Sequence, residues 1–233
     1  MRTRLYAVLG LAGAVLALAG CISLKRTPEA RFFVLQSLAQ PTAAQGRQEP
    51  IGIVGVEAVR LPGHLDRPQL ITWTAPNELM VDEFLRWAEP LEDGITRTLV
   101  ENLAALLPDF QVVRRPWPGG THARCRVAVS LRLFGLQRDG TVQLDGRLTL
   151  LPDRGERALL MQPVSMTRGP LPQGSEDAPP DPGVDVMSEL LADLSRRVAD
   201  AIRTLPPEEE PADEPAGPDA GDEPAEAAGE PGR

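Results

Sequence analysis

The chain has 233 residues and a formal net charge of −9 at pH 7. The charge is concentrated at one end, because residues 206–233 carry ten acidic side chains and one arginine, while residues 1–205 sum to zero. A neutral folded region offers no electrostatic footprint for nucleic acid, so we exclude a nucleic-acid-binding protein. The length is sufficient for one domain with a substantial core.

Residues 1–20 have the pattern of a bacterial lipoprotein signal peptide. Arg2 and Arg4 precede an apolar run of about 16 residues, which is short for a membrane-spanning helix, since such a helix needs about 20. The run ends in "LAGC", which resembles a lipobox, in which the thiol of Cys21 takes a diacylglycerol before cleavage. We therefore predict lipidation at Cys21. The alternative is an ordinary signal peptide that contains a cysteine.

The residue after Cys21 indicates which membrane is involved. Aspartate at this position retains a bacterial lipoprotein in the inner membrane, and Ile22 stands there instead, so we predict a periplasm-facing outer-membrane protein. Several acyl chains on one cysteine anchor a protein stably. Residues 21–30 then form the lipidated N-terminus and its tether. An acylated Cys21 cannot form a disulfide with Cys125, which we expect to be a small buried hydrophobe.

Short strands precede the first predicted helix. Residues 31–38 have strand composition, and residues 51–59 alternate in a way that favours a bulged strand. Residues 69–74 form a further strand. The sequence "APN" then predicts a turn before residues 78–81, which completes a hairpin.

The first helix is predicted between Pro90 and Pro108. Proline is tolerated in the first turn of a helix, and a second proline ends it. The apolar residues in between fall at helical spacing on one face: Leu91, Ile95, Leu99, Leu103 and Leu106. Residues 110–113 follow as the next strand.

The clearest strand signal is a hairpin around Asp139–Gly140, a dipeptide that favours a tight turn because glycine accepts positive φ. Apolar and polar residues alternate on both sides of it, so one face belongs to the core and the other is polar. The predicted core positions are Val127, Val129, Leu131, Leu133, Val142, Leu144, Leu148 and Leu150. Residues 158–167 add one more strand.

A second amphipathic helix is predicted from Pro182, with Asp181 as its cap, to Leu205. Beyond it, residues 206–233 contain no aromatic or large aliphatic side chain, so we predict a disordered acidic tail. Residues 31–205 then form one domain. Its predicted fold class is α+β: a mainly antiparallel β-sheet with two amphipathic helices packed on one face.

The sequence contains no motif for catalysis. It has neither a nucleophile elbow nor a Walker A loop. His64 and His122 are the only histidines, and neither has a partner at metal-ligand spacing, so we expect no metal and no cofactor. His64 lies two residues before Asp66 in a predicted loop, and a histidine in such a place is more often solvated than catalytic. We predict no catalytic residues and no enzyme; a periplasmic hydrolase whose groups meet only in the fold is the least favoured alternative.

Several segments, in a fixed order, resemble a known family. They are the lipobox at Cys21, "RFFVL" (31–35), "IGIVGVEAVRLPGHLDRPQL" (51–70), "NEL" (77–79) and "FLRWAEPLEDGITRTLVENLAALLP" (84–108). Together they resemble the ABC-type transport auxiliary lipoproteins, the PqiC family, and the resemblance extends over about residues 31–205. Each block alone is a weak signal, whereas their spaced order is specific.

The resemblance implies a non-catalytic outer-membrane lipoprotein that serves an MCE-type, ABC-linked lipid transport system and so maintains envelope integrity. The implied partners are an MCE-domain periplasmic or inner-membrane protein and its permease, with the ATPase on a separate subunit. A homo-oligomer is a further candidate assembly. The alternative is a structural outer-membrane assembly or scaffold lipoprotein without a transport role.

The segment "RLPGHLDRP" (60–68) is the candidate partner contact. Its prolines and glycine fix an exposed loop, its arginines offer forked donors, and a nearby tryptophan could anchor an interface. The partner-binding candidates are Arg60, Pro62, Gly63, Arg67 and Trp73. The alternative is structural: the Pro–Gly pair shapes a strand crossover, and Arg67 pairs with Asp66 or Glu57.

Overall fold

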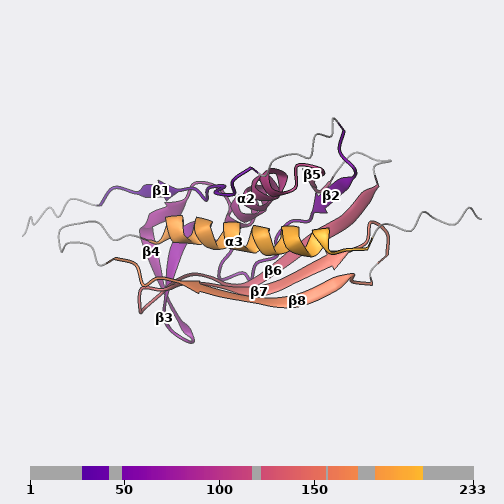
Figure 1. The fold of residues 1–233 in the computed structure, drawn as a ribbon. Helices are drawn as coiled ribbons and strands as arrows, with labels where there is room; N and C mark the ends of the chain where they lie inside the picture. The colour runs from indigo at the N-terminus through magenta and orange to yellow at the C-terminus, as the bar shows by residue number, and fades with distance from the viewer. Residues whose placement is uncertain (1–27, 42–48, 117–121, 156, 173–181, 207–233) are drawn as a thin grey trace, which may run out of the picture.

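The computed structural model of the chain describes residues 28–41, 49–116, 122–155, 157–172 and 182–206. The predicted signal peptide, lipidation site Cys21, helix cap Asp181 and most of the acidic tail lie outside the described residues. In the described part, two helices lie on one face of a curled eight-stranded sheet (Figure 1). The α+β prediction is therefore confirmed.

The described part of the chain contains eight strands and two helices. In chain order they are β1 (Arg31–Phe33), β2 (Ile53–Val56), β3 (Gln69–Ala75), β4 (Glu78–Trp87), α2 (Leu91–Leu106), β5 (Gln111–Arg114), β6 (Ala123–Gln137), β7 (Val142–Leu151), β8 (Leu160–Arg168) and α3 (Val184–Arg203).

The sheet is mixed, which corrects the prediction of a mainly antiparallel one. The strand order is β1-β4-β3-β6-β2-β5, and β7 and β8 continue from the other edge of β6. The hairpin neighbours β3–β4, β6–β7 and β7–β8 are antiparallel, whereas β1–β4, β2–β5, β2–β6 and β3–β6 are parallel. Apolar alternation reveals strands and hairpins but not which distant strand becomes a parallel neighbour.

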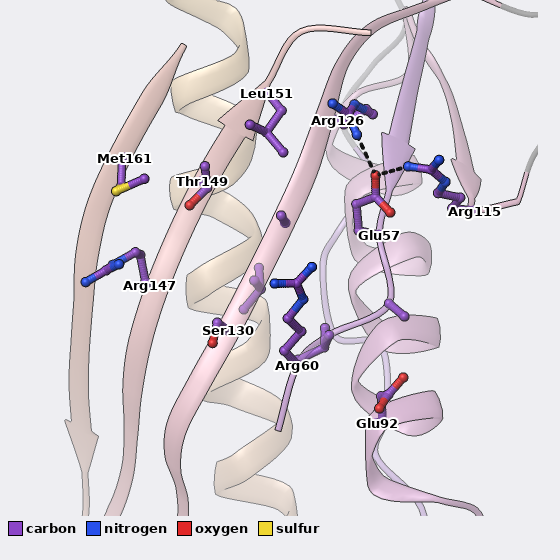
Figure 2. Close-up of a pocket in the computed structure, with 14 residues that line it drawn as sticks. Glu57, Arg60, Glu92, Arg115, Arg126, Ser130, Arg147, Thr149, Leu151 and Met161 are labelled. Atoms are coloured by element: carbon purple, nitrogen blue, oxygen red, sulfur yellow. Dashed lines mark hydrogen bonds and ion pairs between the residues drawn. The ribbon is translucent and has the colours of Figure 1, made fainter. Parts of the chain in front are cut away.

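Strand β6 lies in the middle of the sheet and pairs with three other strands along its two edges. One edge pairs with β7 along most of its length. The other edge pairs in turn with β2, with the backbone of Arg60, which lies opposite Ser130, and with the middle of β3 at Thr72 and Trp73. The Arg60 amide donates to the Val129 carbonyl (3.0 Å), and the Leu131 amide donates to the Arg60 carbonyl (2.9 Å). This bridge holds the segment after β2 on the sheet (Figure 2).

A bulge in β6 changes which residues face the core. The register with β7 shifts between Leu131 and Leu133, opposite Gly146. Before the shift the odd-numbered residues of β6 are buried; after it Phe134 is buried and Leu133 is only half-buried. The prediction that Leu133 continues the core row is therefore wrong. An extra residue in one strand reverses the phase of every side chain that follows it.

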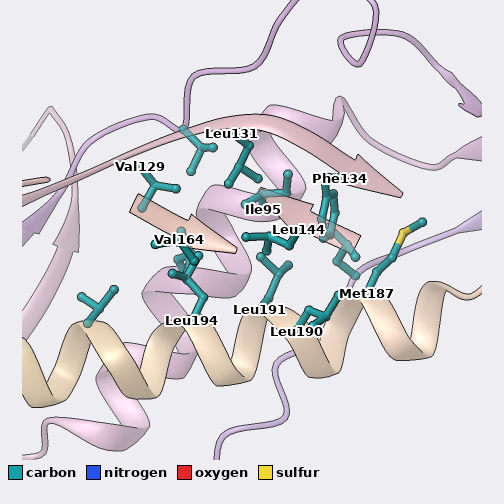
Figure 3. Packing of buried hydrophobic residues seen from close by; sticks show 14 of the residues in the cluster. Ile95, Val129, Leu131, Phe134, Leu144, Val164, Met187, Leu190, Leu191 and Leu194 are labelled. Atoms are coloured by element: carbon teal, nitrogen blue, oxygen red, sulfur yellow. The ribbon is translucent and has the colours of Figure 1, made fainter. Parts of the chain in front are cut away.

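The core between sheet and helices is continuous (Figure 3). All five apolar residues predicted for the first helix are buried in α2, and Cys125 is fully buried in β6, as predicted. Helix α3 packs against β6, β7 and β8, and α2 packs against α3 and β5. Helix α3 begins at Val184, after Gly183 with a positive φ of 72°, rather than at Pro182. A side chain at that glycine would meet Val142 Cγ2 at 2.9 Å.

Two buried polar residues of α2 hold neighbouring chain segments. The Thr96 hydroxyl accepts from the Val59 amide (3.1 Å). The Asn102 Oδ1 accepts three hydrogen bonds: from the Ser37 hydroxyl (2.8 Å) and from the amides of Leu38 (3.0 Å) and Ala39 (2.9 Å). Both side chains are fully buried. Helix α2 thus fixes the segment that follows β1 as well as the segment that follows β2.

An ionic cluster joins β8 to α3 outside the core. Arg168 of β8 pairs with Asp193 (2.6 Å) and Glu189 (2.9 Å) of α3, and Arg196 also pairs with Asp193. Partial burial raises the pKa of Asp193, but hydrogen bonds from Arg168 and Arg196 and their positive charges lower it by more. The pKa of Asp193 therefore lies below the ordinary aspartate value.

We expect this cluster to make stability depend on pH in the acid range. A depressed folded-state pKa means that the contribution of Asp193 is complete above about pH 4, the pKa in an unfolded chain, and is lost as the pH falls through the folded value. Urea unfolding of wild type and Asp193→Asn should differ at pH 7 and converge toward pH 3. Asp200→Asn, an exposed position on the same helix, is the control and should change stability little at either pH. A difference for Asp193→Asn that persists unchanged at pH 3 would contradict the assignment.

Candidate functional site

The polar face of the sheet is hollowed on the side away from α3. The hollow has a volume of about 680 Å³ and lies over Arg126 and Ser130 of β6 and over Arg147 of β7. The segment that follows β2, from Glu57 to Arg60, forms its opposite wall (Figure 2). We call this hollow the arginine groove. Its position follows from the strand pattern, because the alternate residues of β6 and β7 are buried under α3.

Four arginines and two glutamates line the arginine groove: Arg60, Arg115, Arg126, Arg147, Glu57 and Glu92. Glu57 Oε1 accepts from Arg115 (2.7 Å) and from Arg126 (3.2 Å), so two cations share one carboxylate (Figure 2). Arg126 also donates to the carbonyls of Pro152 and Gly155 (both 2.8 Å). The groove therefore carries an excess of positive charge at a fixed, hydrogen-bonded end.

Arg60 and Arg147 lie in one row across the sheet. The backbone of Arg60 is opposite Ser130, and Ser130 is opposite Arg147. Adjacent strands are about 4.8 Å apart, so the two arginine Cα atoms are about 10 Å apart, with a serine hydroxyl between them. Both arginines are exposed, and neither forms an ion pair with another residue that the structure describes. Such a row can bind carboxylates or phosphates.

The loop predicted as the partner contact exposes Gly63, His64 and Asp66, whereas Pro62 and Arg67 are half-buried. The Pro62 carbonyl accepts from the amides of Leu65 (2.8 Å) and Asp66 (3.3 Å), and the Leu65 side chain is buried and holds the loop down. Gly63 is exposed, and a Cβ at that position would meet no atom within 4 Å. A side chain at Gly63 would therefore point outward without disturbing the fold.

Trp73 lies beside this loop rather than in the arginine groove. Its ring meets the His64 ring edge-on, with centroids 5.4 Å apart. It is half-buried and lines a second hollow of about 490 Å³ with Pro76, Arg138 and other residues of the two hairpins. Its Nε1 has no hydrogen-bond partner among the described residues. We call His64, Trp73 and the Pro62–Arg67 loop the loop–hairpin surface.

The structure divides the five predicted contact residues between two surfaces. Arg60 belongs to the arginine groove, whereas Pro62, Gly63, Arg67 and Trp73 belong to the loop–hairpin surface. The structural alternative, an ion pair from Arg67 to Asp66 or Glu57, is not formed in the described part of the chain; Glu57 pairs with Arg115 and Arg126 instead.

The sequence reasoning missed Arg126 and Arg147 as parts of a site. Alternation with buried neighbours does place both on the polar face of the hairpin. Their approach to Arg60 depends on the parallel bridge to Ser130, which connects residues 70 positions apart in the chain and leaves no local pattern. The sequence did contain one signal for this site, because several arginines fall on the predicted polar face of the hairpin.

The titratable side chains are dispersed over the described part of the fold. Among residues 28–206, where they are described, no three His, Cys, Asp or Glu side chains are grouped to hold a metal ion. His122 Nδ1 lies 3.1 Å from Asp153 Oδ2, away from His64, which packs on Trp73. In the same described ranges, neither helix has the length and apolar character needed to cross a bilayer.

Comparison with known proteins identifies the family. The family model described as "ABC-type transport auxiliary lipoprotein component" matches residues 33–199, which is most of the chain. The chain belongs to the ABC-type transport auxiliary lipoprotein family. It is 28% identical over 198 residues to the intermembrane transport lipoprotein PqiC of Escherichia coli K12, covering 83% of this chain and 96% of that protein. The same values hold for PqiC of Shigella flexneri.

Solved structures support the fold of this transport auxiliary lipoprotein. A crystal structure of an uncharacterised protein matches with a TM-score of 0.58 at 20% identity, covering 75% of this chain and 99% of the other. A crystal structure of a Xanthomonas campestris protein matches with a TM-score of 0.57 at 15% identity, covering 73% and 93%. At these identities the likeness concerns the fold alone.

Proposed function

We propose that this transport auxiliary lipoprotein is anchored in the outer membrane through acyl chains on Cys21, with Ile22 as the sorting signal, and faces the periplasm. There it acts as a non-catalytic accessory subunit of an MCE-type, ABC-linked lipid transport system. Its partners are an MCE-domain protein and the associated permease, with several copies of the chain as a candidate assembly. The family match and the likeness to an intermembrane transport lipoprotein support this role.

The observation that carries the docking role is the loop–hairpin surface. The Pro62–Arg67 loop exposes Gly63, His64 and Asp66, and two hydrogen bonds to Pro62 and the buried Leu65 side chain fix its conformation. A pre-ordered loop loses little entropy on binding, and a tryptophan at its side is a favourable anchor. We therefore assign the MCE-domain contact to this surface.

Two other functions fit the observations less well. A scaffold lipoprotein without a transport role would have the same anchor, and only its partners distinguish it. A hydrolase would need His64 near a carboxylate and a hydroxyl in one cleft. His64 packs against Trp73, whereas Glu57 lines the arginine groove and is engaged by two arginines.

Affinity capture of the native lipoprotein from detergent-solubilised envelope tests the proposal. Mass spectrometry first establishes whether Cys21 is acylated; an unmodified Cys21 would contradict the membrane address. Wild type should recover an MCE-domain protein, and Gly63→Arg should recover at least about tenfold less, because the new side chain projects from the loop into the interface.

The control for this experiment is Ala104→Arg, which adds the same side chain at an exposed position of α2. It should leave recovery unchanged, and both variants should keep the thermal midpoint of wild type. Recovery of porin-assembly or peptidoglycan proteins in place of an MCE-domain protein would favour the scaffold role. Equal recovery by Gly63→Arg and wild type would remove the loop from the interface.

A further inference from the structure

The two ends of the arginine groove differ in how their positive charges are satisfied. At one end, each nitrogen of the Arg126 guanidinium donates a hydrogen bond, to the Glu57 carboxylate or to a carbonyl of the turn after β7. At the other end, the Arg60–Ser130–Arg147 row has two exposed arginines, and neither forms an ion pair with a residue that the structure describes. The groove therefore offers unpaired positive charge at the row rather than along its whole length.

Apolar side chains line the groove between its two ends (Figure 2). Ala128 lies opposite Thr149, and Thr149 lies opposite Met161, whose side chain is 59% exposed. Leu151 follows on β7, opposite Arg126. The core lies on the other face of the sheet and includes none of these side chains, so packing does not explain a methionine and a leucine here. We call Ala128, Thr149, Leu151 and Met161 the apolar strip.

The dimensions of the groove suit a ligand with a charged head and an apolar tail. Ser130 and Arg126 are four residues apart on β6, so the apolar strip extends about 13 Å from the row. The volume of about 680 Å³ lies within the range of about 300–1,000 Å³ that is usual for small organic ligands. A compact anion would leave the apolar strip in water, and an uncharged lipid would leave the two arginines unpaired.

We propose that the arginine groove binds an anionic lipid, with the acidic head group at the Arg60–Ser130–Arg147 row and one acyl chain along the apolar strip. Arginine donates paired hydrogen bonds to phosphate oxygens, and the serine hydroxyl adds a donor between the two arginines. Met161 is unbranched and adapts its shape to a flexible chain. The inference rests on the proposed function and deepens it, because this subunit then contacts the transported lipid as well as docking to its partner.

Nuclear magnetic resonance of the full chain in neutral-detergent micelles tests the proposal. Lauroyl lysophosphatidylglycerol, lauroyl lysophosphatidylcholine and inorganic phosphate are titrated separately, and the amide signals of Ser130 and Arg147 and the methyl signal of Met161 are followed. The anionic lipid should move all these signals saturably. The zwitterionic lipid should bind at least about tenfold more weakly, because its head group has no net charge. Phosphate should move the Ser130 and Arg147 signals but not the Met161 signal.

A charge-reversed variant tests the head-group site. Arg60→Glu with Arg147→Glu should bind both the anionic lipid and phosphate at least about tenfold more weakly, as read from the Ser130 amide. Its matched control is Arg138→Glu with Arg197→Glu, two exposed arginines outside the groove, which changes the net charge equally. The control should bind as wild type does.

A methionine variant tests the site of the acyl chain. Met161→Gln should weaken binding of the anionic lipid about tenfold, because the chain loses an apolar contact, and should leave the affinity for phosphate unchanged. Met80→Gln, at an exposed methionine of β4 outside the groove, is the control and should change neither affinity. The Ser130 amide reports binding in both variants.

Three outcomes would overturn the proposal. Equal affinity for the two lysolipids would indicate partition into the micelle rather than recognition of the head group. Equal affinity for phosphate and the anionic lipid, with no loss in Met161→Gln, would make the groove a site for a free anion. A chain whose Ser130, Arg147 and Met161 signals do not move with any of the three ligands would have no ligand site there.

Affinity capture separates this inference from the docking role. Met161 lies outside the loop–hairpin surface, so Met161→Gln should recover an MCE-domain protein as wild type does. Recovery of that protein together with a groove that binds no lipid would overturn the lipid site alone. Lipid binding without recovery of an MCE-domain protein would support the lipid site and contradict the proposed function.

Discussion

Gly146→Ala should destabilise the protein by about 3 kcal/mol or more, although it adds only one methyl group. A Cβ at Gly146 would lie 2.3 Å from the Ser130 carbonyl oxygen and 3.0 Å from the Leu131 Cα. Both are backbone atoms of the β6 bulge, so no side-chain rotation relieves the clash. Relief requires β6 and β7 to separate where their register shifts. Urea unfolding monitored by circular dichroism measures the loss.

Gly63→Ala is the control for this substitution, because its new methyl group meets no atom within 4 Å. Its free energy of unfolding should stay within about 0.5 kcal/mol of wild type. The Gly146 variant should also shift the amide signals of Arg60 and Arg147, since the bulge positions the row in the arginine groove. Unchanged stability for Gly146→Ala would mean that β6 and β7 do not approach as closely as described.

Asn102→Ala should cost about 2–4 kcal/mol, because it leaves the amides of Leu38 and Ala39 without their buried acceptor. The loss of stability should be concentrated in the segment that follows β1, which has few other hydrogen bonds to α2. Hydrogen exchange at the Leu38 and Ala39 amides should therefore accelerate more than exchange in β6 or β7. Urea unfolding gives the global part of the effect.

Ser37→Ala is the matched control for Asn102. It removes one donor but leaves the Asn102 Oδ1 with its two backbone donors, so the cost should be about 1 kcal/mol or less. Slow exchange at Leu38 in Asn102→Ala would show that another contact fastens the segment. The hydrogen bond from Arg97 of α2 to the Leu35 carbonyl (2.8 Å) would be the contact to test next.

Local patterns predicted the helices and hairpins well. The spacing of Leu91, Ile95 and Leu99 identifies the buried face of α2, and Asp139–Gly140 locates the β6–β7 turn. These features depend on residues within a few positions of one another. The polar members of the core were not predicted, since Thr96 and Asn102 look like surface residues until their partners in the segments that follow β1 and β2 are known.

The site was predicted only in part, for the same physical reason. The Pro62–Arg67 loop is marked by its own prolines and glycine, and its tip is exposed at Gly63 and His64. The arginine groove is formed by strand register: Arg60, Ser130 and Arg147 meet because a bridge and a hairpin align them. The β6 bulge adds a second obstacle, because it moved Phe134 rather than Leu133 into the core.

The parallel strand pairs have a consequence for how the chain folds. Phe32 pairs with Arg86, and Val54 pairs with Cys125, so β1 and β2 find their partners more than 50 residues later. A chain made from its N-terminus must therefore keep β1 unpaired until β4 has been synthesised, and β2 unpaired until β5 and β6 have been synthesised. Domains dominated by such distant contacts fold in milliseconds to seconds. During that interval the unpaired edges and apolar residues of β1 and β2 are exposed, which is the condition under which partly folded chains aggregate.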